Sequence, residues 1–104
     1  MANTLKSVQG RGTVSGADIY TVPVGAILTI VGMRAANNDN TQNHWFHIEI
    51  NGFLVTGIET PLPVGSALEV TQANKIVAQE GDVITAYSDE DDVVDVTISY
   101  LLQD

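Results

Sequence analysis

Two histidines, His44 and His47, are the first candidates for chemistry in this chain of 104 residues, which has no other imidazole group. Imidazole can bind metals and transfer protons. The segment 44–51 has the alternation of a β-strand, and residues three apart in a strand point to opposite faces. The pair therefore cannot chelate one ion together. We expect both histidines to be surface or rim side chains and predict no metal site on them.

The densest group of charges is the run Asp89-Glu90-Asp91-Asp92, with Asp95 close behind. Turns rich in carboxylate oxygens can bind calcium. This run, however, lacks the Asp-x-Asp-x-Asp-Gly spacing of an EF-hand loop. The interpretation we prefer is a solvated hairpin turn that discourages edge pairing and favours solubility, with calcium binding as the alternative.

Other catalytic patterns are absent from the sequence. Neither Ser15 nor Ser66 lies in the Gly-x-Ser-x-Gly context of a nucleophile elbow. The segment Gly10-Arg11-Gly12 is not followed by the Gly-Lys-Ser of a phosphate loop. The chain has no cysteine, which removes thiolate nucleophiles and zinc–thiolate sites. The sequence leaves open whether two carboxylates converge in the fold as a catalytic pair, but no pattern identifies such a pair. We therefore predict no enzyme, no catalytic residue and no cofactor.

The charge balance excludes several partners. Thirteen acidic and four basic residues give a formal net charge of −9. Nucleic acids and anionic membranes attract clustered Lys and Arg, so neither is an expected partner. The N-terminus lacks a signal-peptide core, and no apolar run has the roughly 20 residues of a membrane span. The length predicts one globular domain.

The elements that must position these residues are β-strands. Valine, isoleucine and threonine dominate the apolar segments, and turn residues recur about every eight to twelve positions. The strongest hairpin signal is Asn51-Gly52, because a type I′ turn needs positive φ at both positions. We expect an all-β, antiparallel, jelly-roll-like sandwich of eight or nine short strands. The expected strands are residues 5–8, 18–22, 26–35, 44–51, 53–56, 67–71, 75–78, 83–88 and 93–102.

The period of two assigns faces within these strands. In the last strand Val94, Val96, Ile98, Tyr100 and Leu102 should face the core. In segment 44–51 the core face should carry Phe46, Ile48 and Ile50, which places Trp45, His47 and Glu49 on the outside. The single tryptophan, Trp45, is therefore either half covered by a loop or an interface anchor.

Two segments suggest contacts outside the domain. Residues 26–35 are apolar on both faces, which predicts a central strand or one covered by a neighbouring chain. Residues 1–15 carry Lys6 and Arg11 but little apolar surface beyond Leu5 and Val8. They are interpreted as an amino-terminal arm or a first edge strand, with the sandwich domain spanning residues 16–104.

A family resemblance adds to this interpretation. The segment Tyr20-Thr21-Val22-Pro23-Val24-Gly25, an apolar strand and an Asn-rich loop resemble the opening of many short bacteriophage virion proteins. The later segments Pro61-Leu62-Pro63-Val64-Gly65 and Val96-Thr97-Ile98-Ser99-Tyr100 fit the same pattern. The similarity spans about residues 20–102 and consists of turn and strand patterns. Such proteins are β-sandwich subunits that decorate capsids or build necks and tails.

The resemblance implies a structural role in a virion. We expect a capsid decoration (cement) protein on the outer capsid surface, a homotrimer that bridges subunits of the major capsid protein. An acidic subunit would be repelled by DNA inside the shell, although salt limits that repulsion to about a nanometre. The alternatives are a neck or tail subunit and, from another class, a carbohydrate-binding module. Candidate interface residues are Leu5, Lys6, Arg11, Arg34, Trp45 and His47.

Overall fold

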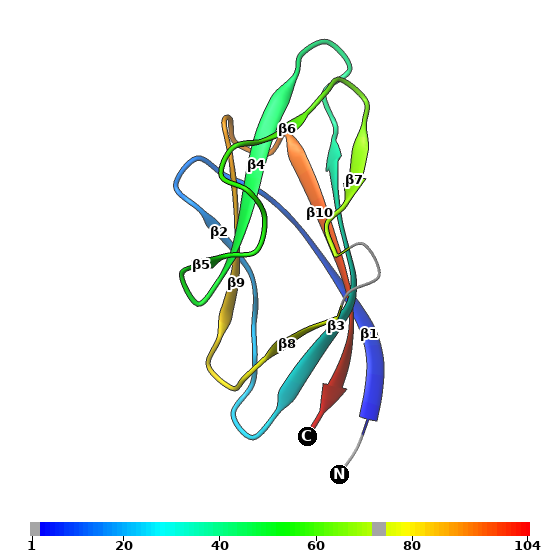
Figure 1. The fold of residues 1–104 in the computed structure, drawn as a ribbon, viewed down its shortest axis with the longest axis vertical. Helices are drawn as coiled ribbons and strands as arrows, with labels where there is room; N and C mark the ends of the chain where they lie inside the picture. Colours follow the sequence, from blue (N-terminus) through cyan, green and yellow to red (C-terminus); the bar gives the residue numbers. More distant parts are fainter. Residues whose placement is uncertain (1–2, 72–74) are drawn as a thin grey trace.

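The structure, a computed structural model, describes residues 3–71 and 75–104, which form ten β-strands in two antiparallel sheets (Figure 1). These residues contain no α-helix and therefore none that is long and apolar enough to cross a membrane. The two sheets pack face to face around a single core of aliphatic and aromatic side chains. The predicted all-β antiparallel sandwich is therefore confirmed.

The first sheet, here called sheet A, places β10 (Val94–Gln103) between β1 (Asn3–Arg11) and β3 (Ile27–Asn37). Two short strands, β7 (Ala67–Glu69) and β8 (Ile76–Ala78), pair with opposite ends of β3. They share one edge of the sheet, so sheet A has four strand positions.

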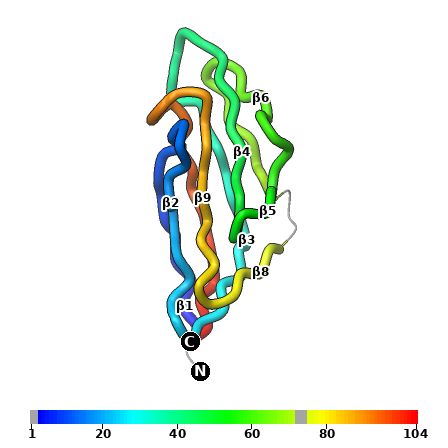
Figure 2. Tube along the Cα trace, turned by 90° about the vertical axis from the view of Figure 1, so that its left-hand side faces the viewer, coloured from blue at the N-terminus to red at the C-terminus, as the bar shows by residue number. Residues whose placement is uncertain are grey.

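The second sheet, sheet B, has the order β2 (Ala17–Thr21), β9 (Val83–Ser88) and β4 (His44–Ile50), as Figure 2 shows. Along the far side of β4 lie β5 (Phe53–Leu54) and β6 (Thr60–Leu62), again two pieces of one edge position. The two sheet orders are those of a jelly roll built from two Greek keys.

The described residues form ten strands where we expected eight or nine, and the strand missing from the expectation is β6. Pro61 and Leu62 were expected to belong to a turn over residues 61–65, and that expectation is wrong, because together with Thr60 they form β6. Pro61 lies in β6 opposite Trp45. Proline has no N–H to donate to a ladder and is tolerated in an edge strand, which is where β6 lies.

The predicted core faces are confirmed in both long strands that we assigned. In β10 the five alternate residues that were expected to face the core, from Val94 to Leu102, are all buried. In β4 Phe46 and Ile48 are buried and Ile50 is half-buried, while Trp45 and His47 lie on the other face. Tyr20 and Tyr100 join the two sheets through rings whose centroids are 5.1 Å apart.

The segment that is apolar on both faces forms β3, which lies in the middle of sheet A. Its inward residues are fully buried, but Ile27 and Val31 remain 38% and 40% exposed. A β-bulge explains why Val31 is exposed. Ser99 pairs with Gly32 and Tyr100 pairs with Ile30, so Val31 is an extra residue in β3.

Residues 3–11 lie in the sheet as β1 instead of extending away from the domain as an arm. The pairing with β10 is continuous from Asn3 opposite Gln103 to Arg11 opposite Asp95. The other side of β1 carries no strand among the described residues. The Asn51-Gly52 turn also has its predicted backbone, with φ of 53° and 82°.

Candidate functional surfaces

The structure divides the candidate interface residues between the two outer faces of the sandwich. Leu5, Arg11 and Arg34 lie on the outer face of sheet A, as their cross-strand partners show. Lys6 is also in β1 but lies opposite Tyr100, on the inward side, where it stays exposed at the rim. Trp45 and His47 are on sheet B, so no single site unites all six residues.

One row of side chains crosses the outer face of sheet A from edge to edge. Leu5 pairs with Leu101, Leu101 with Thr29, and Thr29 with Val77. Leu5 is 71% exposed and Val77 is 55% exposed. Ile27 and Val31 of β3 lie next to this row. The result is an apolar surface contributed by β1, β10, β3 and β8.

The middle of the same face carries small side chains. Ser7 pairs with Ser99, and Ser99 with Gly32. A Cβ atom placed on Gly32 would meet only the Cβ of Ser99, at 3.9 Å, which is ordinary van der Waals contact. Nothing in the chain itself therefore requires glycine here, although glycine weakens a strand interior.

Charged residues appear only at the borders of this face. Arg11 Nε donates to Asp95 Oδ1 at 2.9 Å, a surface ion pair between exposed side chains. Arg34 pairs with Glu69 in the ladder between β3 and β7. The Glu69 carboxylate accepts the N–H of Met33 and the hydroxyl of Thr71, and these bonds lower the pKa of Glu69. Between these pairs and the end of β1 at Asn3, no strand residue on the outer face of sheet A is charged.

The charges of the chain are distributed unequally between the two sides of the sandwich. All four basic residues belong to sheet A or adjoin it: Lys6 and Arg11 in β1, Arg34 in β3, and Lys75 immediately before β8. The strands of sheet A contain only two of the thirteen acidic residues, Glu69 and Asp95. The strands of sheet B also contain two acidic residues, Asp18 and Glu49, but no Lys or Arg, and the other nine acidic residues lie outside the strands.

A second apolar surface lies beside sheet B, at the β4–β5 hairpin and the loop after it. We call it the hairpin surface, and it consists of Phe53, Leu54 and Ile58. Their exposed fractions are 76%, 51% and 69%. This surface and the apolar row of sheet A lie on different sheets, so the molecule exposes two separate apolar regions.

Three aromatic rings lie together on the outer face of sheet B. The rings of Trp45 and His47 are nearly parallel, with centroids 6.0 Å apart, and those of His47 and Tyr87 are 4.6 Å apart. Gly16 lies against Tyr87, because a Cβ there would be 2.6 Å from the ring. The rings are half-buried and stack on one another instead of forming a flat exposed platform.

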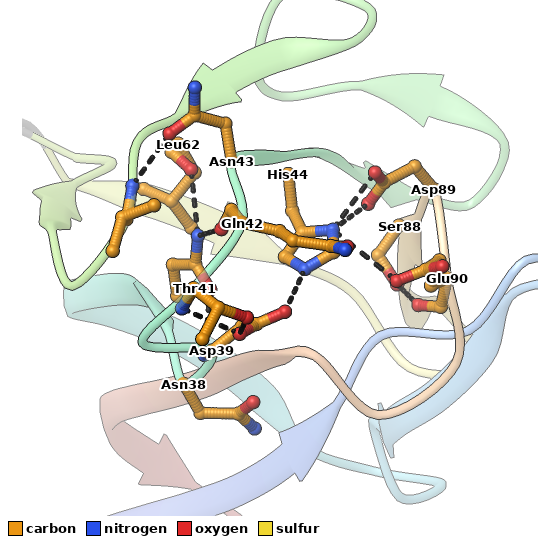
Figure 3. A network of polar contacts seen from close by, with 12 residues as sticks. Asn38, Asp39, Thr41, Gln42, Asn43, His44, Leu62, Ser88, Asp89 and Glu90 are labelled. Carbon is orange, nitrogen blue, oxygen red and sulfur yellow. Dashed lines mark hydrogen bonds and ion pairs between the residues drawn. The ribbon is translucent and has the colours of Figure 1, made fainter.

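His44 corrects our expectation for the two histidines, because it is buried. Its side chain is 1% exposed, and each ring nitrogen faces a carboxylate (Figure 3). Nε2 lies 2.9 Å from Oδ2 of Asp39, and Nδ1 lies 2.9 Å from Oδ2 of Asp89. Ionised carboxylates only accept hydrogen bonds, so both contacts are satisfied when the ring is doubly protonated. His44 thereby joins the loop after β3 to the loop after β9.

The pKa values of this group follow from its hydrogen bonds. The bond to Asp39, and then the bond to Asp89, raises the pKa of His44 against the opposing effect of burial. The same His44 bond, together with the hydroxyl and N–H of Thr41, lowers the pKa of Asp39 to about 2. No pattern in the sequence pairs residue 44 with residue 89, so this network was not predicted.

The acidic run is only partly the solvated turn that we expected. Asp89 accepts from His44, and Asp91 accepts the N–H of Val14 at 2.9 Å. Glu90 is exposed, with Oε2 3.7 Å from Nδ1 of His44. Among the described residues, no group of three or more His, Asp or Glu side chains is arranged to hold a metal ion.

Comparison with known proteins gives no significant match to any family, curated protein or solved structure.

Proposed function

We propose that this chain is a structural subunit of a bacteriophage virion, and specifically a decoration protein on the outside of the capsid. The observation that supports this most is the pair of separate apolar surfaces on a chain of only 104 residues. Exposed apolar surface is costly for a protein that works alone and is typical of contact surfaces. A decoration subunit needs two of them, one for other copies and one for the shell.

The distribution of charge supports an external position. Most acidic residues lie in the loops, and the strands of sheet B carry two acidic residues and no Lys or Arg, while sheet A contains all but one of the basic residues and the uncharged face. A subunit that makes its contacts through neutral surfaces can turn its acidic side toward water. The DNA inside a filled capsid would repel that side.

Two alternatives remain in competition with this proposal. A neck or tail subunit would use the same two contact surfaces, and only its place on the particle differs. A carbohydrate-binding module would need an aromatic ring with a free face, and the described chain offers the exposed Phe53 and the cluster of Trp45, His47 and Tyr87. Mutual stacking of the clustered rings disfavours sugar binding.

Binding to particles tests the proposal. Particles from which this protein has been removed by mild denaturant should bind the purified protein again, with saturation at a fixed number of copies per particle. The Ile58→Glu variant, which places a charge on the hairpin surface, tests whether that surface takes part. Failure of the wild-type protein to bind such particles at tens of micromolar would contradict the proposed function.

The single tryptophan allows a direct test of the carbohydrate alternative. Its fluorescence should not change when neutral oligosaccharides are added at millimolar concentration, because the ring already stacks on His47. A saturable change, together with binding by calorimetry that Trp45→Ala abolishes, would favour a sugar-binding module instead.

A further inference from the structure

We propose that the outer face of sheet A is the surface through which copies of this chain contact one another. This inference rests on the proposed function, since it assigns one of the two contact surfaces that a decoration subunit requires. The partner is a second copy of this chain, bound against β1, β10, β3 and β8.

The charge of the chain favours a second copy over an unlike partner at this face. Each copy has a formal charge of −9, so two copies that meet through acidic surfaces repel each other. A basic partner could bind the acidic loops or sheet B. The outer face of sheet A has no charge on its strand residues between Asn3 and the row that ends in Arg34 and Glu69, one row before the Arg11–Asp95 pair. It is therefore the broad face on which two identical acidic chains can meet without opposing like charges.

The arrangement of side chains fits a contact between equivalent faces. The apolar row from Leu5 to Val77 can pack against the corresponding row of another copy, a two-fold contact that gives a dimer and not the homotrimer expected from the resemblance. Ser7, Ser99 and Gly32 have little bulk, so a second sheet can approach closely at the middle of the face. This close approach also gives a reason for Gly32, which nothing within the chain requires.

The size of the face predicts the strength of the contact. Four strand positions span roughly 19 Å, and the five residues from Asn3 to Ser7, which bound the uncharged part of the face, span roughly 17 Å. The footprint is about 320 Å², compared with about 800 Å² per partner in a standard interface. We therefore expect reversible association, with a dissociation constant on the order of micromolar in the isolated protein.

The experiment is sedimentation equilibrium on the isolated protein from about 5 to 300 μM, without particles, for the wild type and three variants. Leu5→Glu places a charge in the apolar row, and Gly32→Thr adds bulk at a position where a Cβ makes only an ordinary van der Waals contact with Ser99 of its own chain. Ile58→Glu is the matched control, because Ile58 and Leu5 are 69% and 71% exposed. Circular dichroism establishes that each variant is folded.

We expect the wild type and Ile58→Glu to associate, and we expect Leu5→Glu and Gly32→Thr to weaken association at least tenfold. A wild type that stays at 11.1 kDa throughout would overturn the proposal. Association that is unchanged in Leu5→Glu and Gly32→Thr, or weakened equally in Ile58→Glu, would also overturn it. A monomer that still saturates particles would leave the proposed function standing, whereas an oligomer that binds no particle would contradict only that function.

Discussion

His44 and Asp89 lie 45 residues apart in sequence, yet Nδ1 of the buried imidazole is 2.9 Å from Oδ2 of the carboxylate. With Asp39 on the other ring nitrogen, the contact holds together two loops at one end of the sandwich (Figure 3). A charged imidazole between two carboxylates makes this end of the molecule sensitive to pH.

The first prediction concerns alkaline pH. The pKa of His44 is raised above its ordinary value of 6.5, so the folded state binds the proton more tightly than the unfolded chain. The stabilisation is fully present below about pH 6.5 and is lost as the pH rises through the folded pKa. The melting temperature should therefore fall between pH 6.5 and 9.

The variant His44→Gln separates this effect from the general repulsion of an acidic chain. The difference in melting temperature between the wild type and His44→Gln should shrink as the pH rises. A difference that stays constant from pH 6 to 9 would show that the charge of His44 does not stabilise the fold.

The second prediction concerns Gly16, whose φ is 94° and which lies against the ring of Tyr87. An alanine Cβ there would meet both a strained backbone and the ring, 2.6 Å away. Gly25 has a similar φ of 81° but nothing within 4 Å of its Cβ position. Gly25→Ala should cost about 1–2 kcal/mol of unfolding free energy, and Gly16→Ala about 1–3 kcal/mol more. Urea denaturation measures both, and equal losses would mean that the contact with Tyr87 is unimportant.

These features mark what could and could not be predicted from the sequence. The faces of β10 and β4 followed from alternation, because a half-buried strand must place one face in the core. β6 was missed because Pro61 resembles a turn signal, and only its edge position makes it acceptable in a strand. Because segment 26–35 is apolar on both faces, the sequence indicated the part of the apolar surface of sheet A that β3 contributes. The row that adds Leu5, Leu101 and Val77 depends on strand register, which no local pattern specifies.

The third prediction concerns the amino-terminal strand. Removal of residues 2–12 would expose the ladder groups of β10 and remove Val8, which packs against the core. At Gly10 the two sheets are also close, because a Cβ there would lie 2.5 Å from Cδ1 of Ile19. The truncated protein should melt many degrees lower or aggregate, while removal of residues 2–4 alone should have a small effect. A fully stable protein without residues 2–12 would be inconsistent with β1 as an integral strand.

The fourth prediction concerns calcium and the acidic run. Asp89 and Asp91 already accept hydrogen bonds from His44 and from the Val14 N–H, so we expect millimolar calcium to leave the melting temperature nearly unchanged. A site filled at a hundredfold excess over its dissociation constant would add about 2.7 kcal/mol. In a domain of this size that corresponds to roughly 10 °C or more. Such a shift, absent with sodium chloride at the same ionic strength, would establish a calcium site.

The central claim is that this chain lies on the outside of a phage head, and immunogold labelling of intact virions tests it most directly. Antibodies against the purified protein should place gold over the whole head in negative-stain images of untreated particles. Matched particles without the protein serve as the control. Gold confined to the neck or tail would favour the alternative virion position. Purified virions that contain no such protein by mass spectrometry would contradict the account.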